Sequence, residues 1–183
     1  THNYPSAEQP DNGSFVRTLA QQVGKDSAVS VIAPRAIRSI GELRNFRTET
    51  EPDESVDLLR PGYLTYSARR LPGGYSTFRL TSRSFRRSAA RASKGISLRP
   101  DLVHGHFLFP SGNTAVTLAQ RFGVPATVAL GESTPAFYEQ HIGIKRAAAV
   151  AREFQGILAV SERNRDWAIH DLKVDPDRIL VLP

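Results

Sequence analysis

The stretch PDLVHGHFLFPSGNTAVTLAQRFGVPATVAL, residues 100 to 130, decides the class of fold. It places a short apolar run at 102–106, a Pro-Ser-Gly-Asn turn, a helical pattern over 112–123 and a second apolar run at 125–130. Short, continuously apolar strands that alternate with helices of about ten residues are typical of parallel strands buried on both faces. The stretch therefore predicts a strand-helix-strand unit whose two strands are parallel.

The same alternation extends from this unit toward both ends of the chain. We expect helices at 14–23, 145–154 and 162–172, and strands at 28–33, 156–161 and 178–183. This pattern predicts an α/β fold with a Rossmann-like, doubly wound parallel sheet. Because the first helix needs a strand before it to complete the rhythm, we also expect an apolar strand immediately upstream of Thr1.

Residues 35–98 do not follow this rhythm and are expected to be irregular. They contain an acidic patch at 49–57, a Pro-Gly turn at 61–62 and a strand-like segment at 63–71. A segment rich in arginine then covers 79–94, with few large apolar residues to define a buried stripe. We expect it to form a surface helix.

The basic residues of this helix suggest two alternatives. Arg83, Arg86 and Arg87 are candidates to face an acceptor, an acidic glycan or an anionic membrane surface. A solvated helix face would carry the same charges without any partner. Aromatic residues are not interleaved with the arginines as they are in single-strand nucleic-acid platforms, so we expect no nucleic-acid partner.

Composition narrows the function classes. A length of 183 residues favours one compact domain, and 24 Lys plus Arg against 18 Asp plus Glu favour anionic partners. The absence of cysteine excludes disulfides, thiolate metal sites and cysteine nucleophiles. Because the sequence also lacks methionine, we expect it to begin inside a longer polypeptide.

The candidate site residues follow predicted strands, since ligands of open α/β sheets bind beyond the carboxyl ends of the strands. His104 and His106 share one face of a strand end and could be a metal pair, substrate-facing groups or imidazoles bonded to neighbouring backbone. We expect no metal, because no third ligand has suitable spacing. Glu132 follows the next strand and could accept sugar hydroxyls, act as a base or cap a helix.

Other candidates, expected to face the substrate or the donor phosphate, lie at two helix starts and in one loop after a strand. Asn12, Gly13 and Ser14 precede the first helix, where free N–H groups favour phosphate, although a plain turn explains them equally. Gly131 and Ser133 belong to the loop that follows the strand at 125–130. A second set opens the helix at 162–172, with Ser161 as a natural N-cap and Arg163 and Asn164 in the first turn. Capping alone accounts for Ser161.

Several motifs in order resemble one family, the GT-B retaining glycosyltransferases of family 4. The matching pieces are YPSAEQPDNGSFVRTLAQQV (4–23), SVIAP (30–34), the stretch at 100–130 and GILAVSERNRDWAIHDLKVDPDRILVLP (156–183). The resemblance covers nearly the whole chain and is poorest at 35–98. It implies that residues 1–183 form the N-terminal, acceptor-side half of a GT-B fold, with the C-terminal donor-binding domain absent.

The resemblance also implies a function and roles for residues. It implies bacterial transfer of a sugar from a nucleotide-sugar donor to a glycan or lipid-linked acceptor, with retention and without a cofactor. We expect a cytoplasmic protein that could also contact the inner face of the membrane peripherally. The loop at Gly13 resembles the one that approaches the donor diphosphate, and His104 and His106 fall where relatives line the cleft between domains. Gly131 stands where the family often has a histidine or arginine that helps to bind or catalyse. This departure implies that Glu132, His104 or His106 takes that role.

Three rival functions remain open at this point. A nucleotide-sugar epimerase can share the GT-B form and a histidine-containing loop. A noncatalytic module that binds an anionic ligand would suit the basic composition. A metallohydrolase would use His104 and His106 as metal ligands.

Overall fold

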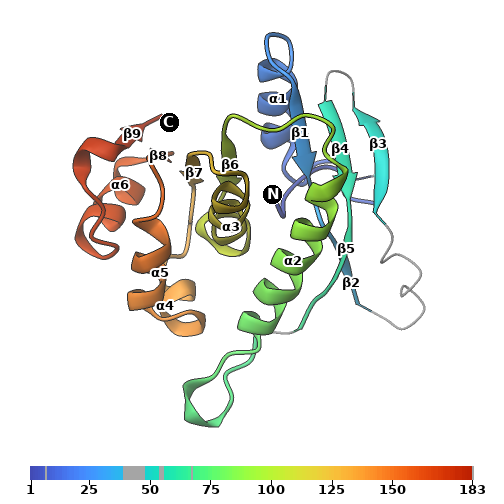
Figure 1. Cartoon of the computed structure of the whole chain (residues 1–183). Helices are drawn as coiled ribbons and strands as arrows, with labels where there is room; N and C mark the ends of the chain where they lie inside the picture. The colour runs from blue at the N-terminus through green and yellow to red at the C-terminus, as the bar shows by residue number, and fades with distance from the viewer. Residues whose placement is uncertain (7, 39–47, 54–55, 67, 183) are drawn as a thin grey trace.

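The structure is a computed structural model that describes residues 1–6, 8–38, 48–53, 56–66 and 68–182 (Figure 1). Its α-helices are α1 (Ser14–Val23), α2 (Phe78–Ala92), α3 (Asn113–Phe122), α4 (Ala136–His141), α5 (Ile144–Ala151) and α6 (Glu162–His170). Its strands are β1 (Val29–Ile32), β2 (Arg35–Ile37), β3 (Glu49–Asp53), β4 (Val56–Arg60), β5 (Gly62–Leu64), β6 (Val103–His106), β7 (Ala126–Leu130), β8 (Gly156–Ala159) and β9 (Ile179–Val181). The α/β class expected from the sequence is confirmed.

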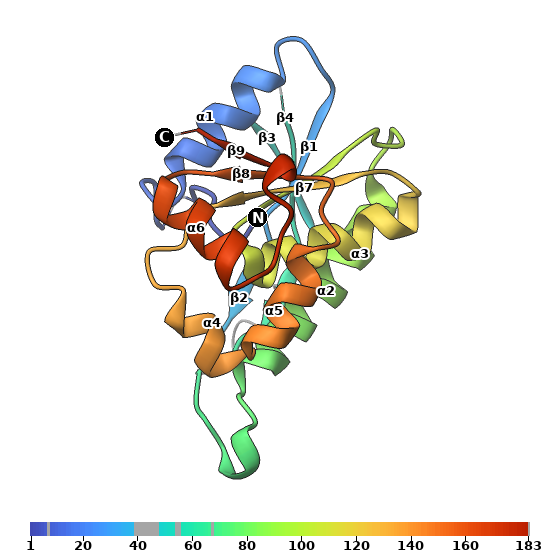
Figure 2. The same ribbon diagram turned by 90° about the vertical axis from the view of Figure 1, so that its left-hand side faces the viewer.

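The second half of the chain builds a parallel sheet in the order β6-β7-β8-β9. Neighbouring residues of β6 point to opposite faces: a Cβ at Gly105 would meet α3 at Ala115, whereas the His106 ring contacts Phe15 of α1. Figure 2 shows α3, α5 and α6 on one side of these strands and α1 on the other. Helices therefore lie on both faces, as a doubly wound sheet requires.

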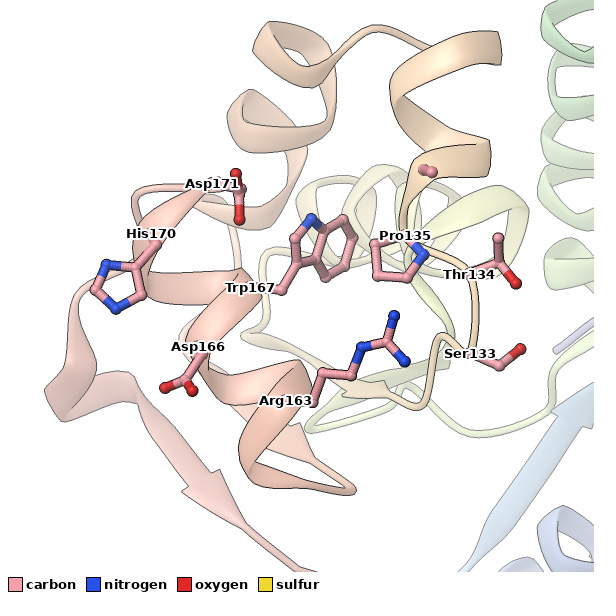
Figure 3. Close-up of a pocket in the computed structure, with 9 residues that line it drawn as sticks. Ser133, Thr134, Pro135, Arg163, Asp166, Trp167, His170 and Asp171 are labelled. Atoms are coloured by element: carbon pink, nitrogen blue, oxygen red, sulfur yellow. The ribbon is translucent and has the colours of Figure 1, made fainter.

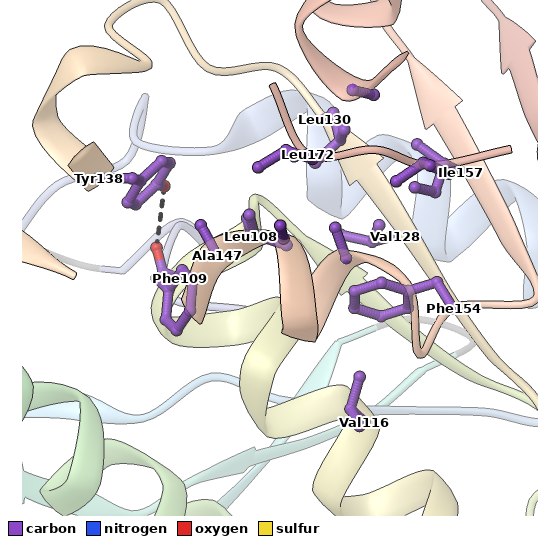
Figure 4. Packing of buried hydrophobic residues seen from close by; sticks show 14 of the residues in the cluster. Leu108, Phe109, Val116, Val128, Leu130, Tyr138, Ala147, Phe154, Ile157 and Leu172 are labelled. Atoms are coloured by element: carbon purple, nitrogen blue, oxygen red, sulfur yellow. Dashed lines mark hydrogen bonds between the residues drawn. The ribbon is translucent and has the colours of Figure 1, made fainter. Parts of the chain in front are cut away.

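The core of this half lies between the sheet and its helices. Leu108, Val128, Leu130, Ile157 and Leu172 are fully buried there and pack together with the ring of Phe154 (Figure 4). Burying such a side chain stabilises the fold by roughly 1.5–3 kcal/mol. The expected alternation of apolar runs and amphipathic helices is therefore explained by this one core.

The region 35–98 is more regular than expected. The acidic patch forms β3 and β4, an antiparallel pair in which β4 also runs parallel to β1. Val56 and Leu58 of β4 are buried, and their alternation with the exposed Asp57 is the strand signal that the acidic residues obscure. Among the described residues of the strand-like segment at 63–71, Tyr63 and Leu64 belong to a strand, β5, which begins at Gly62 and pairs with β2.

Helix α2 buries more of its surface than a surface helix would. Phe85 and Ala89 are 1% exposed, and the hydroxyl of Ser88 donates to the carbonyl of Gly62 at 2.6 Å. The hydroxyl of Ser84 accepts from the Leu64 backbone at 2.9 Å. The helix therefore packs on β5 through short hydroxyl side chains as well as apolar ones, which is why no large apolar stripe is needed.

The segment before β8 forms two helices where one was expected at 145–154. Gly143, with a φ of 89°, separates α4 from α5 and lets the chain turn between them. Ala147 and Ala151 of α5 are fully buried in the core. The helix α4, which the sequence did not suggest, brings Tyr138 inward, where its hydroxyl donates to the carbonyl of Phe109 (Figure 4).

Candidate functional site

The loops that follow β6, β7 and β8 are tied together by Glu132. Its Oε1 accepts a hydrogen bond of 2.6 Å from the backbone N–H of Leu108 in the loop after β6. Its backbone carbonyl accepts one of 3.0 Å from Nδ2 of Asn164 in the first turn of α6. Three loops at the carboxyl edge of the sheet thus share one central residue.

The Glu132 carboxyl group is inside the protein. The residue is 6% exposed, and its Oε2 has no hydrogen-bond partner among the described residues. Burial raises the pKa of this carboxyl to about 7, although the backbone N–H of Leu108 favours the ionised form. The structure gives Glu132 a positioning role toward the 107–112 loop, whereas its role as a base toward sugar stays a prediction.

Ser161 and Asn164 serve the start of α6. The Ser161 hydroxyl accepts from the N–H of Asn164 at 3.2 Å and donates to its Oδ1 at 2.7 Å. Ser161 is therefore the N-cap, as one of the two alternatives expected. Asn164 is buried and holds the Glu132 loop, so both of its side-chain groups are engaged within the protein.

The two histidines of β6 lie edge to face, with ring centroids 4.9 Å apart. Nδ1 of His104 forms a 2.8 Å hydrogen bond with the Thr127 hydroxyl, while its Nε2 is buried without a partner in the described part of the chain. Burial lowers the pKa of His104 to about 4 and that of His106 to about 3, and the latter is lowered further by His104. Both rings are therefore neutral at pH 7.

Metal binding was one alternative for this pair. Within the ranges that the structure describes, no group of three or more His, Asp or Glu side chains is arranged to hold a metal ion. A third histidine, His2, was not among the candidates but lies against the loop that follows β6. Its Nδ1 lies 2.9 Å from the hydroxyl of Ser111, and its ring centroid lies 5.4 Å from that of Phe107.

The loop at Gly13 reaches this edge of the sheet through α1. Phe15, two residues later, contacts His106 with ring centroids 6.0 Å apart. Gly13 has a φ of 74°, and a Cβ there would lie 2.6 Å from the carbonyl carbon of Asn3, so the position requires glycine. Asn12 and Ser14 are exposed beside it.

A buried carboxylate that the sequence did not suggest supports the N-terminal Tyr-Pro segment. Asp53 is 6% exposed and accepts hydrogen bonds from the Tyr4 hydroxyl at 2.6 Å, from Arg17 Nε at 2.9 Å and from Gln21 at 2.9 Å. Burial opposes its ionisation, but these donors hold the pKa of Asp53 below its usual value. The guanidinium of Arg60 donates to the carbonyl of Pro5 and so fixes the residue that follows Tyr4.

Gly131 is packed between two side chains. A Cβ at this position would lie 3.3 Å from a ring carbon of Phe107 and 3.4 Å from a methyl of Val160. Phe107 itself has a φ of 66°, a conformation that side chains rarely adopt. The Phe107 ring therefore lies against the position where the resemblance implies histidine or arginine.

A hollow of about 370 Å³ opens beyond the ends of β7 and β8, between the 133–136 segment and α6 (Figure 3). It brings together Ser133 and Arg163, two of the residues singled out in the sequence. It is also lined by Trp167 and His170, which sequence reasoning missed. Their spacing from Arg163, four and seven residues on, is the helical signal that could have found them.

Arg83, Arg86 and Arg87 lie on α2, and Arg146 lies on α5. The positive charges of Arg146 from α5 and of Arg83 and Arg87 act on the Arg86 guanidinium. Burial and these like charges lower the pKa of Arg86 below its usual value. These four arginines therefore form a cationic cluster whose like charges act on one another. Of the helices described, none is long and apolar enough to cross a bilayer.

Comparison with known proteins agrees with this geometry. One curated relative, named as the teichuronic acid biosynthesis glycosyltransferase TuaC of Bacillus subtilis (strain 168), is 28% identical over 182 residues. The alignment covers 92% of this chain and 44% of that relative, so the chain spans less than half of its length. Residues 13–183 match the model of the glycosyl transferase 4-like domain, and the chain therefore belongs to this family.

Proposed function

We propose that this domain is the N-terminal, acceptor-side half of a glycosyltransferase that moves a sugar from a nucleotide-sugar to a glycan or lipid-linked acceptor with retention. The observation that carries the proposal is the meeting of the Gly13 loop, His106 and the Glu132-centred loops at the carboxyl edge of the parallel strands. Family membership supports glycosyl transfer. The name of the relative from Bacillus subtilis supports a place in polysaccharide biosynthesis.

The roles of the residues follow from their charge and position. Helix α1 begins beside Gly13, and its N-terminus suits the donor diphosphate, since a helix N-terminus favours negative charge without a metal. The low pKa values of His104 and His106 support a role as uncharged hydrogen-bonding groups. Glu132 accepts a hydrogen bond from the Leu108 N–H and so holds the loop that follows the strand of the two histidines.

The sheet topology supports the expected upstream strand. In the described residues, β1 and β6 belong to separate hydrogen-bonded sheets, and Figure 1 shows the N-terminus between them. A parallel strand that enters this space would pair with both edges and join the sheets into one. A second domain after Pro183 would supply the donor-binding half.

The test is an assay of the full-length enzyme with a panel of nucleotide-sugars and acceptor glycans, with the anomeric configuration of the product read by NMR. We expect a glycosidic product with the configuration of the donor, and no turnover by the 183-residue chain alone. Transfer at a normal rate by the chain alone would refute the two-domain proposal. An altered nucleotide-sugar formed without acceptor would identify an epimerase instead.

Alanine variants of the two histidines test the placement of the site. We expect His106→Ala and His104→Ala in the full-length enzyme to lower kcat by at least about tenfold, as the loss of one hydrogen bond of about 1.5 kcal/mol in the transition state would give. Unchanged kcat in both variants, with the fold intact by circular dichroism, would reduce the histidines to structural residues.

The arginine cluster of α2 supports peripheral contact with an anionic membrane. Each basic residue near such a surface contributes about 1 kcal/mol, and the effect is screened by salt. We expect the chain to cosediment with vesicles that contain phosphatidylglycerol but not with phosphatidylcholine alone. Arg87→Gln should weaken this binding about fivefold, whereas Lys25→Gln, with the same charge change beyond α1, should not. Absence of binding at all salt concentrations would refute the membrane contact.

A further inference from the structure

The hollow beside α6 has two ends of different chemistry. Arg163, Ser133 and Thr134 line one end, and Asp166, His170 and Asp171 line the other, with Trp167 and Pro135 between them (Figure 3). Its volume of about 370 Å³ lies within the range of small-ligand sites, which begins at roughly 300 Å³.

Trp167 forms a fixed wall with an unused donor. The residue is 6% exposed, and its indole stacks on Tyr138 with a centroid distance of 6.1 Å and an interplanar angle of 20°. Its Nε1 is buried, and no acceptor for it exists among the residues that the structure describes. The stacking on Tyr138 therefore fixes the indole, which contributes a flat apolar surface to the hollow.

Arg163 provides positive charge without an internal carboxylate. It is exposed, and the described part of the chain shows no ion pair for it, although Arg165 on the same helix lies 3.7 Å from Glu162. In Figure 3 its guanidinium extends along the hollow toward the side of Pro135 and Ser133. A guanidinium with hydroxyl groups nearby is a good partner for a carboxylate or phosphate.

The opposite end suits hydroxyl groups. The carboxylates of Asp166 and Asp171 can accept hydrogen bonds, and the His170 imidazole can accept or donate. A simple anion would gain nothing at this end. A ligand that carries a negative group at one end and several hydroxyls at the other would satisfy both.

We propose that this hollow is an acceptor subsite for an acidic sugar residue, whose carboxylate or phosphate binds Arg163 and whose hydroxyls bind Asp166 and Asp171. Trp167 holds the ring between the two ends. The assignment of the bound sugar as an acceptor rests on the proposed glycosyl transfer, but its binding does not depend on turnover.

The chain contains a single tryptophan, and it lines this hollow, so its fluorescence reports binding at this place. We propose titrating the 183-residue chain with glucuronate, glucose 6-phosphate and glucose. A saturable change is expected with at least one acidic sugar at a concentration about tenfold below that needed for glucose, as a charge-assisted hydrogen bond would give. The stronger of the two acidic ligands identifies the anionic group.

Two variants test whether the tighter binding of the acidic sugar comes from this hollow or from the net charge of the chain. Arg163→Gln should remove the advantage of the acidic sugar, and Arg152→Gln, with the same charge change at an exposed position outside the hollow, should keep it. Both residues are at least partly exposed, so both variants should unfold at the temperature of the parent chain. Equal titration by glucose, no saturable change, or equal losses in both variants would overturn the subsite.

The full-length enzyme provides the functional arm. Arg163→Gln should raise the KM for an acidic acceptor about tenfold, with kcat and the KM for the nucleotide-sugar within twofold. A change in the donor KM instead would overturn the assignment to the acceptor. If glucuronate binds at Trp167 but the enzyme transfers no sugar, the proposed function fails while the acidic-sugar site stands.

Discussion

Replacing Glu132 by glutamine should change how the stability of this protein depends on pH. Burial raises the pKa of the Glu132 carboxyl from 4.5 to about 7 in the folded protein. Below pH 4.5 the carboxyl is protonated in both the folded and the unfolded chain, so it imposes no penalty. Between pH 4.5 and 7 only the unfolded chain releases its proton, so the free energy of unfolding falls as the pH rises.

The magnitude follows from the size of the pKa shift. A rise from 4.5 to about 7 corresponds to about 3 kcal/mol, all of it lost above pH 7. Glutamine cannot ionise, and its carbonyl oxygen can still accept from Leu108. Glu132→Gln should therefore match the parent chain near pH 4.5 and exceed its free energy of unfolding by up to about 3 kcal/mol at pH 8.

Urea unfolding between pH 4.5 and 8, followed by the fluorescence of Trp167, measures this difference directly. The buried histidines add a pH dependence of opposite sign, but they do so in both proteins and cancel in the comparison. The exposed Glu139→Gln is the matched control and should follow the parent chain throughout. A difference between Glu132→Gln and the parent that stays constant with pH, or grows toward low pH, would refute the reasoning.

Two further substitutions test the contacts that hold the N-terminal loop. Gly13→Ala should lower the free energy of unfolding by more than about 3 kcal/mol, because the backbone strain adds to a clash with Asn3. The control Gly74→Ala, at a φ of 76° with open space around it, should lower it by only about 1 kcal/mol. Equal losses in the two variants, measured by urea unfolding, would contradict this view. Asp53→Asn should lower it by about 2 kcal/mol at pH 7 and by less as the pH falls below the usual range of aspartate, because the lowered pKa reflects donors to the ionised form. An Asp53→Asn loss that is the same at pH 3 and pH 7 would show that these donors do not favour the ionised group.

Much of the fold could be predicted because its signals are local. The parallel strands at β6, β7, β8 and β9 are short apolar runs, and α1, α3 and α6 carry their apolar residues at helical spacing. The Ser161 cap is also a local feature, since a hydroxyl reaches the N–H of the third residue after it. The resemblance to family 4 glycosyltransferases rested on the same segments, and the family match confirms it.

The errors arose where burial depends on distant residues. The charges of β3 and β4 obscured a strand pattern that becomes favourable only when β4 pairs with β1. The helix α4 is too short for periodicity to reveal and is held by Tyr138 in the core. Packing against β5 depends on hydroxyl groups of α2 whose backbone partners lie 20 and 26 residues away in the sequence.

In the candidate site, too, the features with local sequence signals could be predicted, and those that depend on distant residues could not. Strand ends and glycine loops placed His106, Gly131 and Ser161 at one edge of the sheet from the sequence alone, because parallel strands end at a common edge. Only the tertiary structure decided what each side chain does there: Glu132 turns inward to Leu108, while Arg163 is exposed beside Trp167. Local spacing determines which face a residue occupies, but the desolvation, hydrogen bonds and charges it meets there come from segments that folding brings beside it.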